Sequence, residues 1–122
     1  GTALHEVDVS VLQTFSPQRA DPVMRARFLK AASAQGVHRF EDIRATVGAA
    51  HAYDAVHLLA KATTAAGSTD RSKVRNALEH LPAWRGLVKN YSPAFTVTSH
   101  EAFTRADLQM MRFGADGMMV PR

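Results

Sequence analysis

The fold is decided by residues 50–81, which read AHAYDAVHLLAKATTAAGSTDRSKVRNALEHL. The first part belongs to an alanine- and leucine-rich run from about Gly48 to Ala66, and this run predicts the strongest helix of the chain. We expect Gly67 to end that helix, because glycine readily adopts the left-handed conformation found at helix C-termini. Capping residues at positions 68–70 then start a second helix, which Pro82 stops.

The spacing of apolar residues predicts which side of the long helix is buried. Ala52, Val56, Leu59 and Ala60 follow one another in i, i+4, i+7, i+8 order, which places them on one face of a helix. We therefore expect Val56 and Leu59 to lie in the core.

Upstream of this segment, the sequence predicts one strand and one helix. Residues 7–15, VDVSVLQTF, are rich in β-branched residues and partly alternate, as a half-buried strand does. Asp21-Pro22 then provides a capping carboxylate followed by a proline suited to the first helical position, and Gly36 is a natural stop after about Gln35. One short helical turn is expected at positions 41–44.

Downstream, short extended pieces are expected. Positions 84–99 contain Gly86, Pro93 and a β-prone FTVT, which together favour loops and brief strands. Positions 107–113, DLQMMRF, predict a strand, and Asp116-Gly117 before MMV is typical of a hairpin turn.

Length and composition indicate one folded unit. The chain has 122 residues, of which 46% are hydrophobic and 21% charged, as in an ordinary globular protein. It contains no cysteine, which excludes disulfides and thiolate metal sites. No run approaches the roughly 18 apolar residues of a spanning helix.

The chain is modestly basic, with 15 Lys and Arg against 11 Asp and Glu and a net charge of +4. These cations are spread along the whole sequence, whereas a nucleic-acid binder usually concentrates them in one stripe. We therefore expect no nucleic-acid partner. The alternative is a small basic helical domain that binds nucleic acid or a protein partner through two helical cation groups: Arg25, Arg27, Lys30, Arg71, Lys73 and Arg75.

Motifs for catalysis or metal binding are lacking in the sequence. His51 and His57 lie six positions apart, about 240° round a helix, so they do not share a face. His51 and Asp54 could meet, but there is no H-E-x-x-H or G-x-S-x-G motif, and the glycines are scattered. His100-Glu101 is interpreted as a polar surface pair in a loop. We expect a protein that is not an enzyme and needs no metal or other cofactor.

Three stretches resemble a known family when taken together. The segment quoted above is similar to the Ala-Tyr-Asp-Ala-Val helix, connector and following helix of type I periplasmic solute-binding proteins of ABC transporters, in the branched-chain amino acid receptor family. RGLVKNYSPAFTVTSHEAF (85–103) and ADLQMMRFGADGMMVPR (106–122) resemble the end of one proteobacterial branch, and VSVLQTFS (9–16) resembles a strand that crosses between the two lobes.

The resemblance implies an α/β fold, namely the carboxy-terminal part of a two-lobed receptor with three main helices and a few crossing or hairpin strands. Residues 1–16 would form a crossing strand and hinge. Residues 17–105 would form the helical part that completes the first lobe, and residues 106–122 the terminal strand and hairpin.

The resemblance also implies a function in uptake, in the periplasm. Such a receptor binds an amino acid or small carboxylate between its lobes and presents it to an ABC permease. The residues that match ligand-bordering or hinge positions of the family are Phe15, Val47, Gly48 and Ala50. Gly48 falls where some relatives carry an aromatic ring, which leaves room for a bulkier ligand. Because most ligand-holding groups of the family lie outside the matched segments, we expect the isolated chain to bind no amino acid at physiologically useful affinity. In the family architecture the helices that begin near Asp21, Gly48 and Asp70 cover a parallel sheet whose strands lie mostly outside the matched segments. Their apolar faces would therefore be open, and we expect a homodimer.

Overall fold

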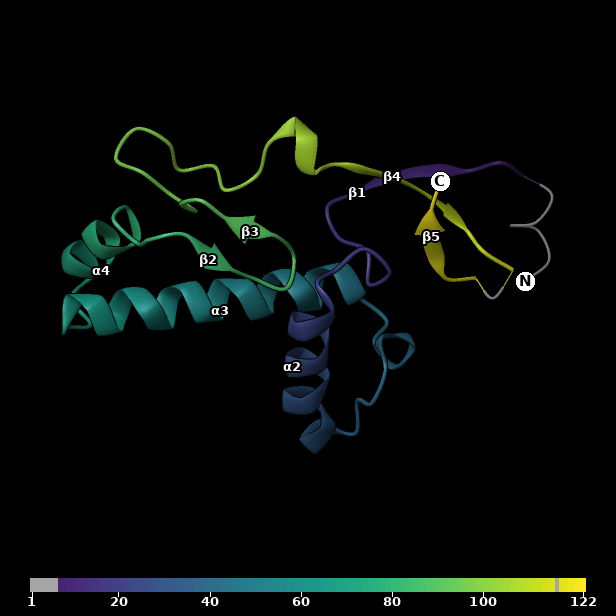
Figure 1. Ribbon diagram of the computed structural model, residues 1–122, viewed down its shortest axis with the longest axis horizontal. Coiled ribbons are helices and arrows are strands. Elements are labelled where there is room, and N and C mark those ends of the chain that lie inside the picture. The colour runs from purple at the N-terminus through teal and green to yellow at the C-terminus, as the bar shows by residue number, and fades with distance from the viewer. Residues whose placement is uncertain (1–6, 116) are drawn as a thin grey trace.

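The computed structural model describes residues 7–115 and 117–122. Within these residues the protein is mixed α/β, with three α-helices and two small antiparallel sheets (Figure 1). The elements, in chain order, are β1 (Ser10–Gln13), α2 (Pro22–Ala32), α3 (Thr46–Ala66), α4 (Arg71–Leu78), β2 (Trp84–Arg85), β3 (Asn90–Tyr91), β4 (Gln109–Phe113) and β5 (Met119–Pro121). Short 3-10 turns occupy Ser33–Gln35, Phe40–Asp42 and Arg105–Asp107.

The other two helices and the β2–β3 hairpin are arranged along the long helix α3. In Figure 1 its first turns lie beside α2, its last turns lie beside α4, and the β2–β3 hairpin runs along it. Gly67 ends α3 with φ 57°, and the Asp70 side chain then accepts a hydrogen bond from the Lys73 amide to start α4. Both predicted helices and their boundaries are thus confirmed to within two or three residues.

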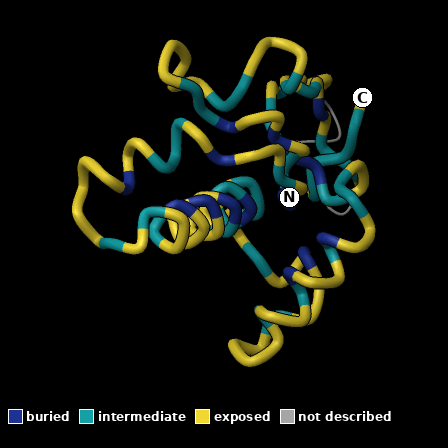
Figure 2. The backbone as a smooth tube through the Cα atoms, turned by 60° about the vertical axis from the view of Figure 1, so that its left-hand side comes forward, coloured by how far each residue is buried: buried dark blue, intermediate teal, exposed yellow. Residues whose placement is uncertain are grey.

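The predicted buried face of α3 is wrong. Its buried residues are Ala50, Asp54, Leu58 and Ala62, whereas Val56 is 64% exposed and Leu59 is 52% exposed. Figure 2 views α3 almost along its axis and shows buried and exposed residues on opposite sides. Apolar residues occur on both sides of this helix, so spacing alone did not distinguish them. The buried carboxylate of Asp54 accepts hydrogen bonds from the hairpin, and these bonds orient the helix.

Helix α2 begins as predicted, but it ends at Ala32, three residues before the predicted Gln35, and a 3-10 turn follows. One carboxylate oxygen of Asp21 accepts from the amides of Val23, at 2.9 Å, and Met24, at 3.1 Å. Pro22 is the first helical residue, and Gly36 stops the following 3-10 turn with φ 76°. The side chains of Met24 and Phe28 are the buried ones.

The larger sheet brings the two ends of the described chain together. Its order is β1-β4-β5, all antiparallel, with Val11 opposite Met111 and Arg112 opposite Val120. The predicted strand at 7–15 is too long, because β4 ends at Phe113 and the chain then turns at Gly114. Val7 and Val9 accordingly lie exposed instead of facing a core.

The terminal hairpin is confirmed in the described residues around its turn. Gly117 has φ 79°, and its amide donates to the Gly114 carbonyl at 2.9 Å. Asp116 lies outside the described residues. Strand β4 starts at Gln109, two residues later than the predicted start at 107, because the Arg105–Asp107 turn precedes it.

The core consists of two clusters arranged along α3. The first joins the start of α3 to α2 and to the segment after β1, with Phe15, Phe28 and Phe40 among its buried residues. The second joins the rest of α3 to α4 and β3, with Leu58, Leu81 and Tyr91 among its buried residues. Asp54 lies on α3 between these two groups.

Candidate functional site

A cavity of about 540 Å³ lies between the larger sheet and the start of α3. We call it the β1–α3 cavity. The sheet contributes Gln13, Met111, Phe113 and Met119, and the segment before and at the start of α3 contributes residues 40, 41 and 43–48. Its volume falls within the roughly 300–1,000 Å³ typical of small-molecule sites.

Aromatic and methionine side chains form the inner wall. Phe15 is 1% exposed and Phe40 is 3% exposed, with ring centroids 6.0 Å apart and ring planes tilted by 47°. Met111 lies on the sheet side and is also buried. Because these side chains are packed by the core behind them, the wall is preformed and apolar.

Three of the four residues expected at the ligand lie on this one cavity. Phe15 comes from the end of the β1 segment, and Val47 and Gly48 come from the first turn of α3. A Cβ added at Gly48 would meet no atom within 4 Å, so the space beside it is open. Ala50 is different: it is 0% exposed, packs in the first core cluster and does not line the cavity.

The polar groups of the cavity sit around this apolar wall. Glu41 and Arg44 are exposed, and within the described part of the chain neither takes part in an ion pair. The Thr46 hydroxyl donates to the Ile43 carbonyl at 2.9 Å. Arg44 is therefore a cation on the wall that forms no ion pair among the described residues, and the carboxylate of Glu41 lines the same cavity.

Asp54 is a buried carboxylate with a structural role that the sequence did not predict. It is 1% exposed, and its two carboxylate oxygens accept from the backbone amides of Leu87, at 2.7 Å, and Val88, at 2.8 Å. The Tyr91 hydroxyl donates to it at 3.1 Å. Burial, and then the charge of Asp54, raise the pKa of Tyr91 far above its usual range. Every bond of this carboxylate serves to hold the β2–β3 hairpin on α3.

Gly86 is required by the same arrangement. A Cβ at this position would stand 2.5 Å from Oδ2 of Asp54 and 2.7 Å from Cε2 of Tyr91. The only sequence signal for the contact between Asp54 and Gly86 is that Asp54 is the single acidic residue of a helix rich in alanine and leucine.

His51 connects α3 to the segment after β1. Its Nε2 lies 2.7 Å from the Thr14 hydroxyl, and its ring centroid lies 4.9 Å from that of Phe103. Burial lowers the pKa of His51, with a smaller opposing effect from the charge of Asp54. No hydrogen bond joins His51 to Asp54 among the described residues, although their spacing of three positions allowed the two side chains to meet.

His100 bonds a residue other than its neighbour Glu101. His100 Nε2 lies 2.8 Å from Oε1 of Glu79 on the C-terminal side of α4, rather than bonding to its neighbour Glu101. Across residues 7–115 and 117–122, no three His, Asp or Glu side chains gather in a way that could hold a metal ion. No helix of the described chain is long and apolar enough to cross a bilayer.

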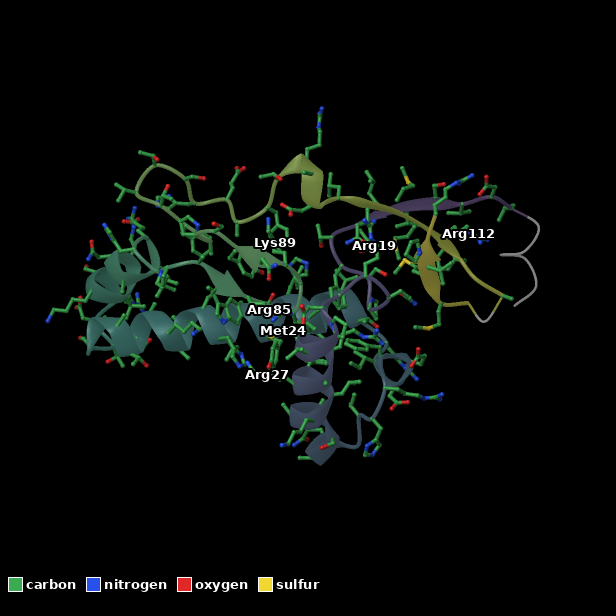
Figure 3. The ribbon with its side chains drawn as sticks, in the orientation of Figure 1. Arg19, Met24, Arg27, Arg85, Lys89 and Arg112 are labelled. Atoms are coloured by element: carbon green, nitrogen blue, oxygen red, sulfur yellow. The ribbon has the colours of Figure 1, made fainter. Side chains whose placement is uncertain are left out.

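The cations of α2 and those of α4 lie in different parts of the molecule. Figure 1 shows α2 near the start of α3 and α4 near its end, so the two helical cation groups lie far apart. Several cations are paired: Arg85 donates to Asp21 at 2.9 Å, and Lys89 donates to Asp107 at 2.6 Å. Figure 3 labels Arg85 and Lys89 near the centre of the view. The Lys89 hydrogen bond is the largest cause of the lowered pKa of Asp107.

Comparisons with known proteins leave the family open. The chain matches no protein-family model, and no curated protein or solved structure resembles it significantly.

Proposed function

We propose that this chain is part of the solute-binding component of an ABC-type uptake system of the branched-chain amino acid kind, acting in the periplasm. Its ligand is an amino acid or small carboxylate, and its partner is a membrane permease. The observation that carries the proposal is the β1–α3 cavity, where Phe15, Val47 and Gly48 share one wall. Two of these residues lie more than thirty positions from the third, so their meeting is a product of the fold.

The chemistry of the wall supports this ligand class. Aromatic and methionine side chains suit the apolar body of a ligand, because they bury its surface without polar cost. Arg44 suits a carboxylate, because a guanidinium can donate two parallel hydrogen bonds to it. The open space beside Gly48 suits a bulky side chain.

Binding by this chain alone will be weak. The cavity is open, and a receptor of this kind closes a second lobe over its ligand, which adds polar contacts and excludes water. We expect a dissociation constant of about 1 mM, equivalent to roughly −4 kcal/mol.

Nuclear magnetic resonance titration tests the proposal at this affinity. Aliphatic and aromatic amino acids, and the carboxylates that lack their amino group, are added to labelled protein, and the amides of Val47 and Gly48 are followed. Saturable shifts confined to the cavity are expected. Absence of shifts at about 20 mM of every ligand, which is well above the expected constant, would refute the proposal.

Two variants identify the site. Gly48→Phe should fill the open space and weaken binding by about tenfold, whereas Ala31→Phe, on the exposed side of α2, should leave it unchanged. Arg44→Gln should weaken carboxylate binding by about threefold to fivefold, the usual range for an exposed ion pair. Arg39→Gln is the matched control, because Arg39 pairs with Asp42 and does not line the cavity. Equal effects of the cavity and control variants would place the ligand elsewhere.

A further inference from the structure

The exposed side of α3 lacks the charges that a water-facing helix normally carries. We call it the outer face and define it by Ala52, Val56, Leu59, Ala60 and Thr63. The ionisable side chains of α3 lie off this face. Asp54 is buried, and Lys61 stands 5.8 Å over the Trp84 ring. The ring of His57 stacks on Trp84 at 6.0 Å, and His51 bonds Thr14. The hydroxyl of Thr63 is turned back onto the Leu59 carbonyl at 2.9 Å. An amphipathic surface helix instead places charged and polar residues opposite its buried stripe.

The outer face has a ridge and a groove side by side. Val56 and Leu59 project from it, 64% and 52% exposed. Next to them lies a groove of about 280 Å³ whose walls are Ala55, Leu59, Leu78, Phe95, Ala102 and Phe103, together with residues 51, 58 and 91. All but one of these side chains are aliphatic or aromatic, and the exception, His51, already bonds Thr14.

We infer that the outer face binds a second copy of this chain. A twofold dimer requires one patch that complements itself, so that each residue i meets residue j of the partner and the reverse. A projecting ridge beside an apolar groove meets this requirement, because the ridge of each copy can enter the groove of the other. A patch without charge also brings no like-charged side chains into direct contact when two copies meet on it.

The area sets the strength of this dimer. An α-helix of 21 residues is about 31 Å long and roughly 10 Å wide, so its face and the adjoining groove offer a few hundred Å² per partner. Stable complexes bury about 800 Å² per partner. An interface this small favours a reversible dimer, and we expect a dissociation constant of about 10–100 µM.

Sedimentation velocity over a concentration series tests the inference. The unmodified chain should pass from monomer to dimer in the range of about 5–500 µM, the range that brackets the expected constant. Val56→Glu should weaken the dimer at least about tenfold, because a carboxylate buried in the interface loses its hydration. Val23→Glu is the matched control, since Val23 is 52% exposed on α2 and should leave the constant unchanged.

Cross-linking provides an independent measure. The chain has no cysteine, so Val56→Cys introduces a single thiol on the ridge, and a flexible bis-maleimide reagent that spans the two ridges should give a cross-linked dimer that Val23→Cys does not give. Circular dichroism confirms that each variant is folded. A monomer at every concentration, or a dimer that Val56→Glu and Val23→Glu weaken equally, would overturn the inference.

Discussion

The two sides of α3 have similar compositions and opposite environments. The inner side packs Ala50, Leu58 and Ala62 around the buried carboxylate of Asp54, while the outer side leaves Val56 and Leu59 in water. Hydrophobicity does not separate them, because leucine and alanine occur on both. The difference is the set of hydrogen bonds that Asp54 accepts from the hairpin. A polar contact thus decides which apolar face of the helix is buried.

We expect removal of the Asp54 carboxylate to destabilise the inner side of α3 strongly. Asp54→Ala leaves the amides of Leu87 and Val88 buried without an acceptor, and we expect a loss of about 3–5 kcal/mol in the free energy of unfolding. A urea melt followed by circular dichroism measures it. Asp54→Asn, which keeps one acceptor oxygen, should lose less. A change below about 1 kcal/mol in Asp54→Ala would show that the inner side is held by apolar packing alone.

Two adjacent leucines, Leu58 and Leu59, lie on opposite sides of α3 and should differ in their contribution to stability. Leu58→Ala should cost about 2–5 kcal/mol, because Leu58 is 6% exposed within the second core cluster. Leu59→Ala should cost about 0.5 kcal/mol or less at concentrations where the chain is monomeric, since its side chain is half exposed. The same urea melt compares both. Equal losses would mean that the two sides of α3 are equally buried.

Local signals in the sequence predicted the boundaries of the helices but not their packing. Proline, glycine and aspartate act within a few residues, so Asp21, Gly36, Gly67 and Asp70 could be assigned from their neighbours. The burial of the inner side of α3 depends on hydrogen bonds from the amides of Leu87 and Val88, thirty-three and thirty-four residues after Asp54. The spacing of apolar residues within the helix carries no information about such distant partners.

The candidate site was predictable to a similar degree. The resemblance placed Phe15, Val47 and Gly48 near a ligand, and the fold brings them to one cavity. Ala50 was assigned with them, although two residues beyond Gly48 is about 200° around the helix, which turns it into the core. The wall formed by Phe40, Phe113 and Met111 was missed, because it is assembled from segments far apart in sequence.

His51 should make a small contribution to the pH dependence of folding stability. Burial lowers the pKa of His51 in the folded chain below its value of 6.5 in the unfolded chain, so the unfolded state binds more protons just below pH 6.5. Stability should therefore fall as the pH drops through this range and recover above it. Asp107 contributes a separate loss only below about pH 3.8, because its folded pKa is lowered.

Thermal melts between pH 5 and 7 measure the contribution of His51. His51→Gln should flatten the dependence in that window, whereas His38→Gln, at an exposed position, should not. An unchanged slope in His51→Gln would assign the effect to other groups.

The accessibility of methyl groups on α3 distinguishes the inner side of this helix from its outer side. In methyl-labelled protein, a soluble paramagnetic agent should broaden the signals of Val56 and Leu59 strongly and leave Leu58 almost unaffected at low protein concentration. As the concentration rises through the dimer range, the Val56 and Leu59 signals should become protected while Leu58 stays unchanged. Equal broadening of Leu58 and Leu59 at low concentration would contradict the assignment of an inner and an outer side to α3.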